Sequence, residues 1–189
     1  MIGSELNGCE ILHNDPDKLH LAPFVNPSLP LEKQQRSCRE FARIYELGGA
    51  KCAVHKDIVW HRWRKLVWNA SFNPVCALVD LDSGTIQDAG CLDTLIRPAM
   101  NEVVAIAKAA GYDLPSGIQD QMVALTPKET YLKPSMQVDA QRGRPMEIEV
   151  ILGNPLRVAR DLLVPAPTLT TLYSLLLARQ WTCNNNTGA

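Results

Sequence analysis

The chain has 189 residues, of which 46% are hydrophobic and 21% are charged, and its formal net charge is -1 at pH 7. This composition is typical of a globular protein with one domain-sized core, and it excludes a disordered chain. Lysine and arginine are spread along the chain, and no apolar run approaches the roughly 18 residues of a membrane span. We therefore expect neither a nucleic acid nor a membrane as a partner, and we expect a cytoplasmic location.

Residues 1–55 carry the signals of a β-β-α-β unit. Two short alternating runs lie on either side of a turn-forming Asn-Asp-Pro-Asp cluster, and an amphipathic helix then ends at a pair of glycines. The predicted strands are Cys9–His13, Lys18–Ala22 and Lys51–His55, and the predicted helix is Leu31–Leu47. Because so few strands cannot form a closed sheet, this unit is expected to belong to a larger one.

Residues 56–183 have helical periodicity and no strand pattern. The predicted helices are Ile58–Leu81, Asp93–Ala110, Ser116–Leu125, Lys133–Gln141, Met146–Leu163 and Thr168–Trp181. Residues 184–189 have nothing apolar to bury and are expected to be a disordered tail. The predicted fold class is therefore mainly α, a helical bundle preceded by the β-β-α-β unit.

The predicted helix at Ile58–Leu81 carries three polar side chains on one face of an otherwise apolar segment. Lys65, Asn69 and Asn73 stand four residues apart, so at roughly 100° per residue they lie within an arc of about 80°. Burying such groups without partners costs about 1–3 kcal/mol for each amide and more for the ammonium. The pattern therefore predicts a ligand site, an internal hydrogen-bond network, or a partly exposed edge where Lys65 reaches water.

Four segments follow one another with recognisable motifs. The three polar residues lie in a K-x-x-x-N-x-x-x-N-P motif, and the later motifs are S-M-x-x-D, an E-I-E segment followed by a glycine, and V-P-x-P followed by Leu-Tyr. The segments are Lys65–Val75, Pro134–Asp139, Gly143–Asn154 and Val164–Tyr173. In order and spacing they resemble the helical domain of the ketopantoate reductase (2-dehydropantoate 2-reductase) family.

The resemblance implies a domain organisation. Residues 56–183 would be the substrate-binding and catalytic domain, with the helical fold of the 6-phosphogluconate dehydrogenase C-terminal type. Residues 1–55 look like the C-terminal remnant of an NADPH-binding Rossmann domain. No G-x-G-x-x-G motif follows a predicted strand, so the dinucleotide fingerprint is absent from these 189 residues. The chain alone is therefore expected to be inactive.

The resemblance also implies a reaction and its residues. The reaction is the NADPH-dependent reduction of 2-dehydropantoate to (R)-pantoate, on the route to pantothenate and coenzyme A. Hydride transfer to a keto carbon develops an alkoxide, which a desolvated ammonium can stabilise and protonate, and Lys65 is the candidate acid. Asn69, Asn73 and Ser135 would bind the substrate, and Glu147 would order the site as a second catalytic residue. A homodimer is one expectation for the assembly.

Each of the later residues has an ordinary structural explanation as well. Ser135 could be a helix cap after Pro134, and Glu147 could be a first-turn carboxylate stabilised by the helix dipole. Glu102 also falls where the family has an acid, but a glutamate on the polar face of a helix is common. The four histidines share no metal-ligand spacing with the cysteines or carboxylates, so no metal is predicted.

Two positions depart from the family's pattern. Leu132 stands where bacterial members carry a substrate-binding asparagine, and Asp82-Ser83-Gly84 stands where an Asn-Gly turn is familiar. These departures leave three alternatives to a ketopantoate reductase. They are a reductase of another small 2-keto acid, a pseudoenzyme, and a non-catalytic helical module for dimerisation or ligand binding.

Overall fold

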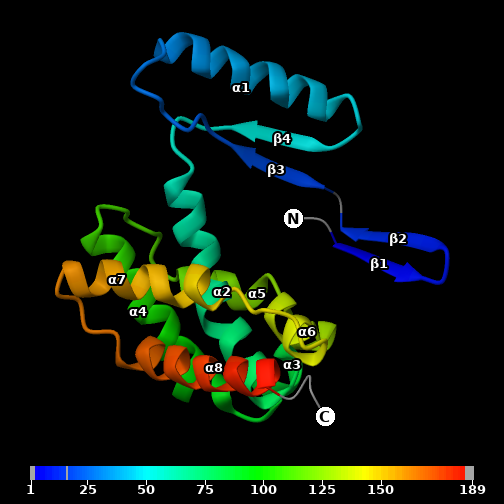
Figure 1. Ribbon diagram of the computed structural model, residues 1–189, viewed down its shortest axis with the longest axis vertical. Coiled ribbons are helices and arrows are strands. Elements are labelled where there is room, and N and C mark those ends of the chain that lie inside the picture. Colours follow the sequence, from blue (N-terminus) through cyan, green and yellow to red (C-terminus); the bar gives the residue numbers. More distant parts are fainter. Residues whose placement is uncertain (1–2, 16, 186–189) are drawn as a thin grey trace. The chain divides into compact units, whose positions relative to one another are not determined.

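The computed structural model describes residues 3–15 and 17–185 (Figure 1). The chain divides into two compact units, residues 1–61 and residues 62–189, and each is described by itself. No helix among the described residues has the length and apolar character that crossing a bilayer requires.

The first unit contains two small sheets and one helix. Strands β1 (Gly3–Asn7) and β2 (Glu10–Asp15) form an antiparallel hairpin. Strands β3 (Lys18–Leu21) and β4 (Lys51–Val54) pair in parallel, and α1 (Leu31–Glu46) makes the crossover between them and lies along β4 (Figure 1). The predicted β-β-α-β order is confirmed, with β1 as an additional strand. Its sequence, GSELN, has a single apolar residue, so it lacks the alternation that predicts a strand.

The apolar faces of this unit are largely open within the described residues. Parallel sheets are normally covered on both faces, yet β3 and β4 stand as a two-stranded pair. Of the 16 residues of α1, only Ala42 is buried. Phe41 and Ile44 on the same helix are 51% and 56% exposed, and Phe24 in the preceding loop is 97% exposed. Such surfaces are typical of one layer of a larger α/β domain.

The second unit is a helical bundle, as the sequence predicts. Seven α-helices cover most of it: α2 (Val59–Val79, which begins in the first unit), α3 (Ser83–Asp88), α4 (Arg97–Ala109), α5 (Ile118–Ala124), α6 (Ser135–Gln141), α7 (Asn154–Asp161) and α8 (Pro167–Asn185). A 3-10 turn, η2, spans Lys128–Thr130. Only α3 and this turn have no counterpart among the predicted helices. Helix α8 includes Asn184 and Asn185, the first two residues of the predicted disordered tail. The rest of that predicted tail, residues 186–189, lies outside the described residues.

Two helices open with a π turn. The turn η1 (Leu92–Ile96) leads into α4, and η3 (Glu149–Gly153) leads into α7. In both cases the π turn ends two residues before a proline, Pro98 or Pro155. Proline has no N–H and its ring crowds the carbonyl four residues earlier, so a widened turn relieves the clash without ending the helix.

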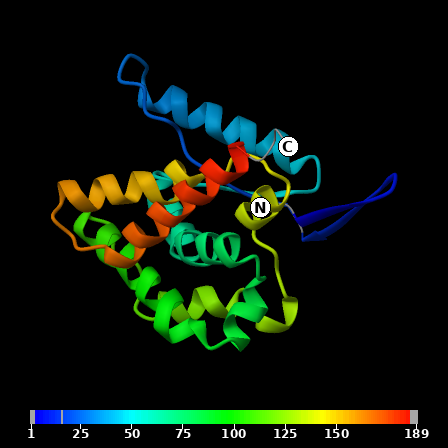
Figure 2. The same ribbon diagram turned by 60° about the horizontal axis from the view of Figure 1, so that its bottom comes forward.

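Helix α2 is the centre of the bundle. In both views the other helices of the unit surround its C-terminal half (Figures 1 and 2). Every residue from Ala70 to Ala77 is buried, which is typical of a helix packed on all sides. Burial raises the pKa of the Cys76 thiol to about 12, so this cysteine packs as a small apolar side chain.

Hydrogen bonds clamp the C-terminal end of α2. The chain turns there through Asp80, whose φ is 58°. The Asp80 carboxylate accepts hydrogen bonds from the Nε2 atoms of Gln137 (3.2 Å) and Gln141 (2.7 Å), both on α6. These two amides lower the pKa of Asp80. From α8, the Arg179 guanidinium donates to the carbonyl oxygen of Leu78 at 3.1 Å. Two helices distant in sequence are thereby tied to the end of α2.

The clamp predicts a graded response to substitution at Asp80. We expect Asp80→Ala to lower the free energy of unfolding by about 2–3 kcal/mol, because it removes both amide contacts and puts alanine at a positive φ. Asp80→Asn keeps an acceptor oxygen and tolerates that backbone conformation, so it should cost less. Chemical denaturation at about pH 7 measures both. Wild-type stability in Asp80→Ala would contradict the clamp.

The same contacts set a pH dependence. Because the hydrogen bonds lower the pKa of Asp80, its ionised carboxylate stabilises the fold fully above the ordinary carboxyl pKa. That contribution is lost as the pH falls through the lowered value. The difference in stability between wild type and Asp80→Asn should therefore shrink on acidification.

Candidate functional site

The three polar residues of the K-x-x-x-N-x-x-x-N-P motif all lie on α2. Since α2 is helical without interruption from Val59 to Val79, the four-residue spacing puts Lys65, Asn69 and Asn73 on one face. Their burial increases along the helix: Lys65 is exposed, Asn69 is half-buried and Asn73 is only 1% exposed. The face therefore runs from a solvent-accessible ammonium to a buried amide.

None of these three side chains has a hydrogen-bond or ion-pair partner in the described part of the chain. Among the described residues, no hydrogen bond or ion pair involves the side chain of Lys65, Asn69 or Asn73, and the buried Oδ1 atom of Asn73 has no partner there. An unpaired buried amide oxygen costs about 1–3 kcal/mol. The predicted alternative of an internal hydrogen-bond network is thus not what the described residues form. Two alternatives remain, a ligand site and a partly exposed edge where Lys65 reaches water, because Lys65 is exposed.

Ser135 lies on a segment that is anchored near the end of α2. It is the exposed first residue of α6, and its hydroxyl caps no described backbone group. The same helix donates two amides to Asp80, as described above. Three residues before Ser135, the carbonyl oxygen of Leu132 accepts a hydrogen bond from the backbone N–H of Ser83 at 2.9 Å. Both ends of the 132–141 segment are therefore attached to the turn that follows α2.

The two positions that depart from the family's pattern are joined directly by that bond between Ser83 and Leu132. Ser83 is fully buried and its hydroxyl has no partner among the described residues, whereas the Leu132 side chain is 40% exposed. Next to Ser83, a β-carbon on Gly84 would lie 2.1 Å from the carbonyl oxygen of Lys128, so only glycine fits. The departures thus form one structural unit and are not two scattered changes.

Glu147 lies just before a helix and is attached to α2 by a different route. It is exposed, and its carbonyl oxygen accepts from the N–H of Ile151 (3.0 Å) as the helix through η3 and α7 begins. The preceding N–H, that of Met146, donates to Oε1 of Gln180 at 2.8 Å. Gln180 adjoins Arg179, which holds the end of α2. No described hydrogen bond or ion pair joins Ser135 or Glu147 to the α2 face, so their grouping with Lys65 stays a prediction.

Other residues of the motifs have a structural role that the sequence did not assign. The Glu149 carboxylate accepts from Arg157 at 2.8 Å and from the hydroxyl of Tyr173, and these bonds lower the pKa of Glu149. A β-carbon on Gly153 would lie 2.3 Å from that carboxylate, so glycine makes room for it. The network ties η3, α7 and α8 together at the surface.

Glu102 also has a structural role. Its two carboxylate oxygens accept hydrogen bonds from the backbone N–H groups of Thr168 and Leu169, each at 2.8 Å. These groups belong to the first turn of α8, where the helix dipole favours a negative charge. Glu102, on α4, therefore caps α8 from outside that helix.

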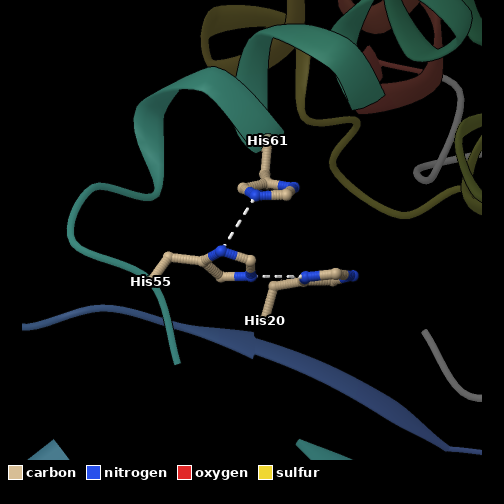
Figure 3. Close-up of side chains that lie close together, drawn as sticks. All are labelled: His20, His55 and His61. Carbon is tan, nitrogen blue, oxygen red and sulfur yellow. Dashed lines mark hydrogen bonds between the residues drawn. The ribbon is translucent and has the colours of Figure 1, made fainter. Parts of the chain in front are cut away.

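The structure also brings together three histidines that the sequence did not connect. His20, His55 and His61, all in the first unit, offer one ligand nitrogen each within 4.8 Å of one another (Figure 3). Among the described residues this is the group suited to a metal ion. Separations of 35 and 6 residues match no ligand motif, so the spacing carried no signal.

Comparisons with known proteins establish the family. Residues 57–180 match the family model described as "Ketopantoate reductase PanE/ApbA C terminal". The chain belongs to this family.

The similar proteins include one without an assigned function and several reductases. An uncharacterized protein of Saccharomyces cerevisiae is 36% identical over 77% of this chain and 42% of its own length. A 2-dehydropantoate 2-reductase of Nostoc is 30% identical over 73% of this chain and 43% of its own length. The crystal structure of 2-dehydropantoate 2-reductase from Methylococcus capsulatus has a TM-score of 0.80 and 34% identity, and the match covers 97% of this chain and 62% of that one. The chain thus spans less than half the length of the two curated relatives.

Because the buried Asn73 amide oxygen has no partner among the described residues, an apolar substitution at Asn73 should change the stability of the fold little. We expect Asn73→Leu to change the free energy of unfolding by less than about 1 kcal/mol, because it removes an amide oxygen that has no partner among the residues the structure describes. Gln137→Leu is the matched control at an equally buried amide. It should cost about 1–2 kcal/mol, because it removes the contact with Asp80. Chemical denaturation compares the two, and a loss above about 2 kcal/mol for Asn73→Leu would assign Asn73 to the packing of the core.

Proposed function

We propose that the chain provides the substrate-binding and catalytic part of an NADPH-dependent 2-dehydropantoate 2-reductase. The observation that carries the proposal is the face of α2, where one ammonium and two amides have no partner among the described residues. Membership of the ketopantoate reductase family supplies the reaction class. Without the family membership, the same face would indicate only a site for a small polar ligand.

The proposed roles of the residues follow their burial along the α2 face. Asn69 and the buried Asn73 would hold the substrate's hydroxyl and keto oxygens through amide hydrogen bonds. NADPH, when bound, supplies the hydride for the keto carbon. Lys65 would stabilise the negative charge that develops on the keto oxygen and donate the proton that completes the alcohol. Ser135 would bind the carboxylate or the facing hydroxyl, and Glu147 would order Lys65 or the substrate.

The exposure of Lys65 implies that part of the site comes from elsewhere. An ammonium transfers its proton to an alkoxide more readily in a water-poor site. Within the described residues Lys65 is exposed, so the exclusion of water would depend on the substrate and on a nucleotide-binding domain.

The first unit fits the proposed remnant of such a domain. We propose that residues 1–55 form the last layer of a Rossmann domain, whose other strands and helices would cover the open β3–β4 pair and the exposed Phe41 and Ile44. Since these 189 residues have no G-x-G-x-x-G motif, the pyrophosphate would be held outside them. The chain alone would then be inactive.

A second candidate function has a specific observation in its favour. Leu132 puts an exposed apolar side chain three residues before Ser135, at a position where the resemblance leads one to expect an asparagine. An apolar group there would favour a 2-keto acid with fewer hydroxyl groups than 2-dehydropantoate. A reductase of another small 2-keto acid is therefore the alternative.

The test of the reductase proposal is to join the chain to a complete nucleotide-binding domain of a 2-dehydropantoate 2-reductase and to follow NADPH oxidation. With 2-dehydropantoate we expect turnover, and we expect Lys65→Ala to lower kcat by about 10²–10⁴-fold. Lys65→Arg should keep KM close to that of wild type but not restore kcat, because a guanidinium does not release its proton. Lys108→Ala, at an exposed lysine on α4, is the matched control and should have wild-type rates.

If the joined wild-type protein turns over no 2-keto acid, although circular dichroism shows it folded and NADPH binds, the reductase proposal is wrong. A non-catalytic helical module would then be the better description. Equal kcat for wild type and Lys65→Ala would remove Lys65 from the mechanism.

Substitution at Leu132 discriminates between the substrates. We expect Leu132→Asn to raise kcat/KM for 2-dehydropantoate relative to an unhydroxylated 2-keto acid by about tenfold or more, because an amide can hydrogen-bond the substrate's hydroxyl. Leu125→Asn, at another exposed leucine, is the control. An unchanged ratio would show that Leu132 does not determine specificity.

A further inference from the structure

The histidine cluster of the first unit is held by backbone pairing. In the parallel pair, His20 of β3 is in register with Ala53 of β4, and the ladder continues as the N–H of His55 donates to the carbonyl oxygen of Leu21 at 2.7 Å. His55 is thus two residues beyond the register partner of His20, on the same side of the sheet. His61 lies in the first turn of α2, six residues after His55. Two strands and a helix start therefore converge on one point.

The three imidazoles are already close to one another in the described structure. Nδ1 of His20 lies 2.9 Å from Nε2 of His55, and Nε2 of His61 lies 3.1 Å from Nδ1 of His55 (Figure 3). The ring centroids of His55 and His61 are 4.0 Å apart. Histidine binds a metal ion through a ring nitrogen, and here nitrogens from three rings lie close together.

The spacing suits a single small cation. Zinc–nitrogen bonds of about 2.0–2.1 Å in a tetrahedral site put neighbouring ligand nitrogens about 3.3 Å apart. One nitrogen from each of the three rings already lies within 4.8 Å of the other two. The remaining approach of about 1.5 Å is within the reach of side-chain rotation, because the terminal torsion of histidine is broad.

We propose that His20, His55 and His61 form a binding site for one divalent transition-metal ion, with Zn²⁺ as the ion that fits best. Three neutral imidazoles suit Zn²⁺, Cu²⁺ and Ni²⁺, whereas Mg²⁺ and Ca²⁺ require oxygen ligands. Three protein ligands leave a fourth tetrahedral position for water.

The bound ion would link β3, the segment after β4 and the first turn of α2. Its cross-link joins residues 35 and 6 positions apart, so it would stabilise the first unit against separation of these elements. The site uses none of the residues assigned to the proposed reductase, so the metal-binding proposal can be tested independently of that function.

The experiment is a titration of the 189-residue chain with Co²⁺, followed by displacement with Zn²⁺. A tetrahedral nitrogen site predicts one equivalent of Co²⁺ with intense visible absorption and without the near-ultraviolet charge transfer of a cobalt–thiolate bond. His20→Gln, His55→Gln and His61→Gln should each weaken Zn²⁺ binding by at least about 100-fold. His13→Gln, which removes the fourth histidine, is the matched control and should bind as wild type does.

Two further measurements keep the result decisive. Circular dichroism of each variant shows that loss of binding is not loss of fold. In wild type, the imidazole nitrogen signals in NMR should shift for three of the four histidines when Zn²⁺ is added. Absence of binding, unchanged affinity in the three glutamine variants, or a thiolate spectrum lost in Cys52→Ser would each overturn the proposal.

Discussion

The helical unit depends on one constraint, the complete burial of residues Ala70–Ala77 of α2. A helix packed on all sides can carry polar groups only where they find partners or where a cavity or ligand satisfies them. The segment Ala70–Ala77 is buried throughout, and within it Asn73 has an amide oxygen without a partner among the described residues. Core stability alone would favour an apolar residue there. Under the proposed function, asparagine at this position would lower stability in exchange for a contact with the substrate.

The contacts at the end of α2 explain how segments far apart in the sequence could share one site. Asp80 holds α6, and Leu78 holds α8 through Arg179. The first attachment includes Gln137, two residues after Ser135. The second is made by Arg179, and the next residue, Gln180, accepts a hydrogen bond from the N–H of Met146, the neighbour of Glu147. The polar contacts that hold these helices are made by Asp80, Leu78 and their partners, and not by the predicted site residues. This division between supporting and uncommitted polar groups is what preorganisation of a binding site requires.

Much of this fold could be predicted because local sequence patterns encode most of its elements. The 3.6-residue period and the glycine stops located α1, α2, α4 and α8 to within a few residues. Strand β1 and helix α3 were missed because the first has one apolar residue and the second has only six residues. The π turns were missed for a different reason, since the helical period runs through both of them and does not distinguish a π turn from an α turn.

The candidate site was predictable only in part, and the limit is again physical. The α2 face is a local pattern, so helical geometry was enough to group its three residues. The roles of Glu102 and Glu149 depend on partners 66 and 24 residues away, and no local period encodes them.

The histidine cluster shows this limit most clearly. His20 and His55 meet because β3 and β4 pair in parallel across an intervening helix, and a shift of one residue in that pairing would put His55 on the opposite side of the sheet from His20. A ligand set of this kind depends on strand register, which a sequence specifies only through the packing of the whole sheet. Within the described residues, the parallel pairing of β3 with β4 and the packing of α1 on β4 set that register, so the approach of the imidazoles is a property of this unit.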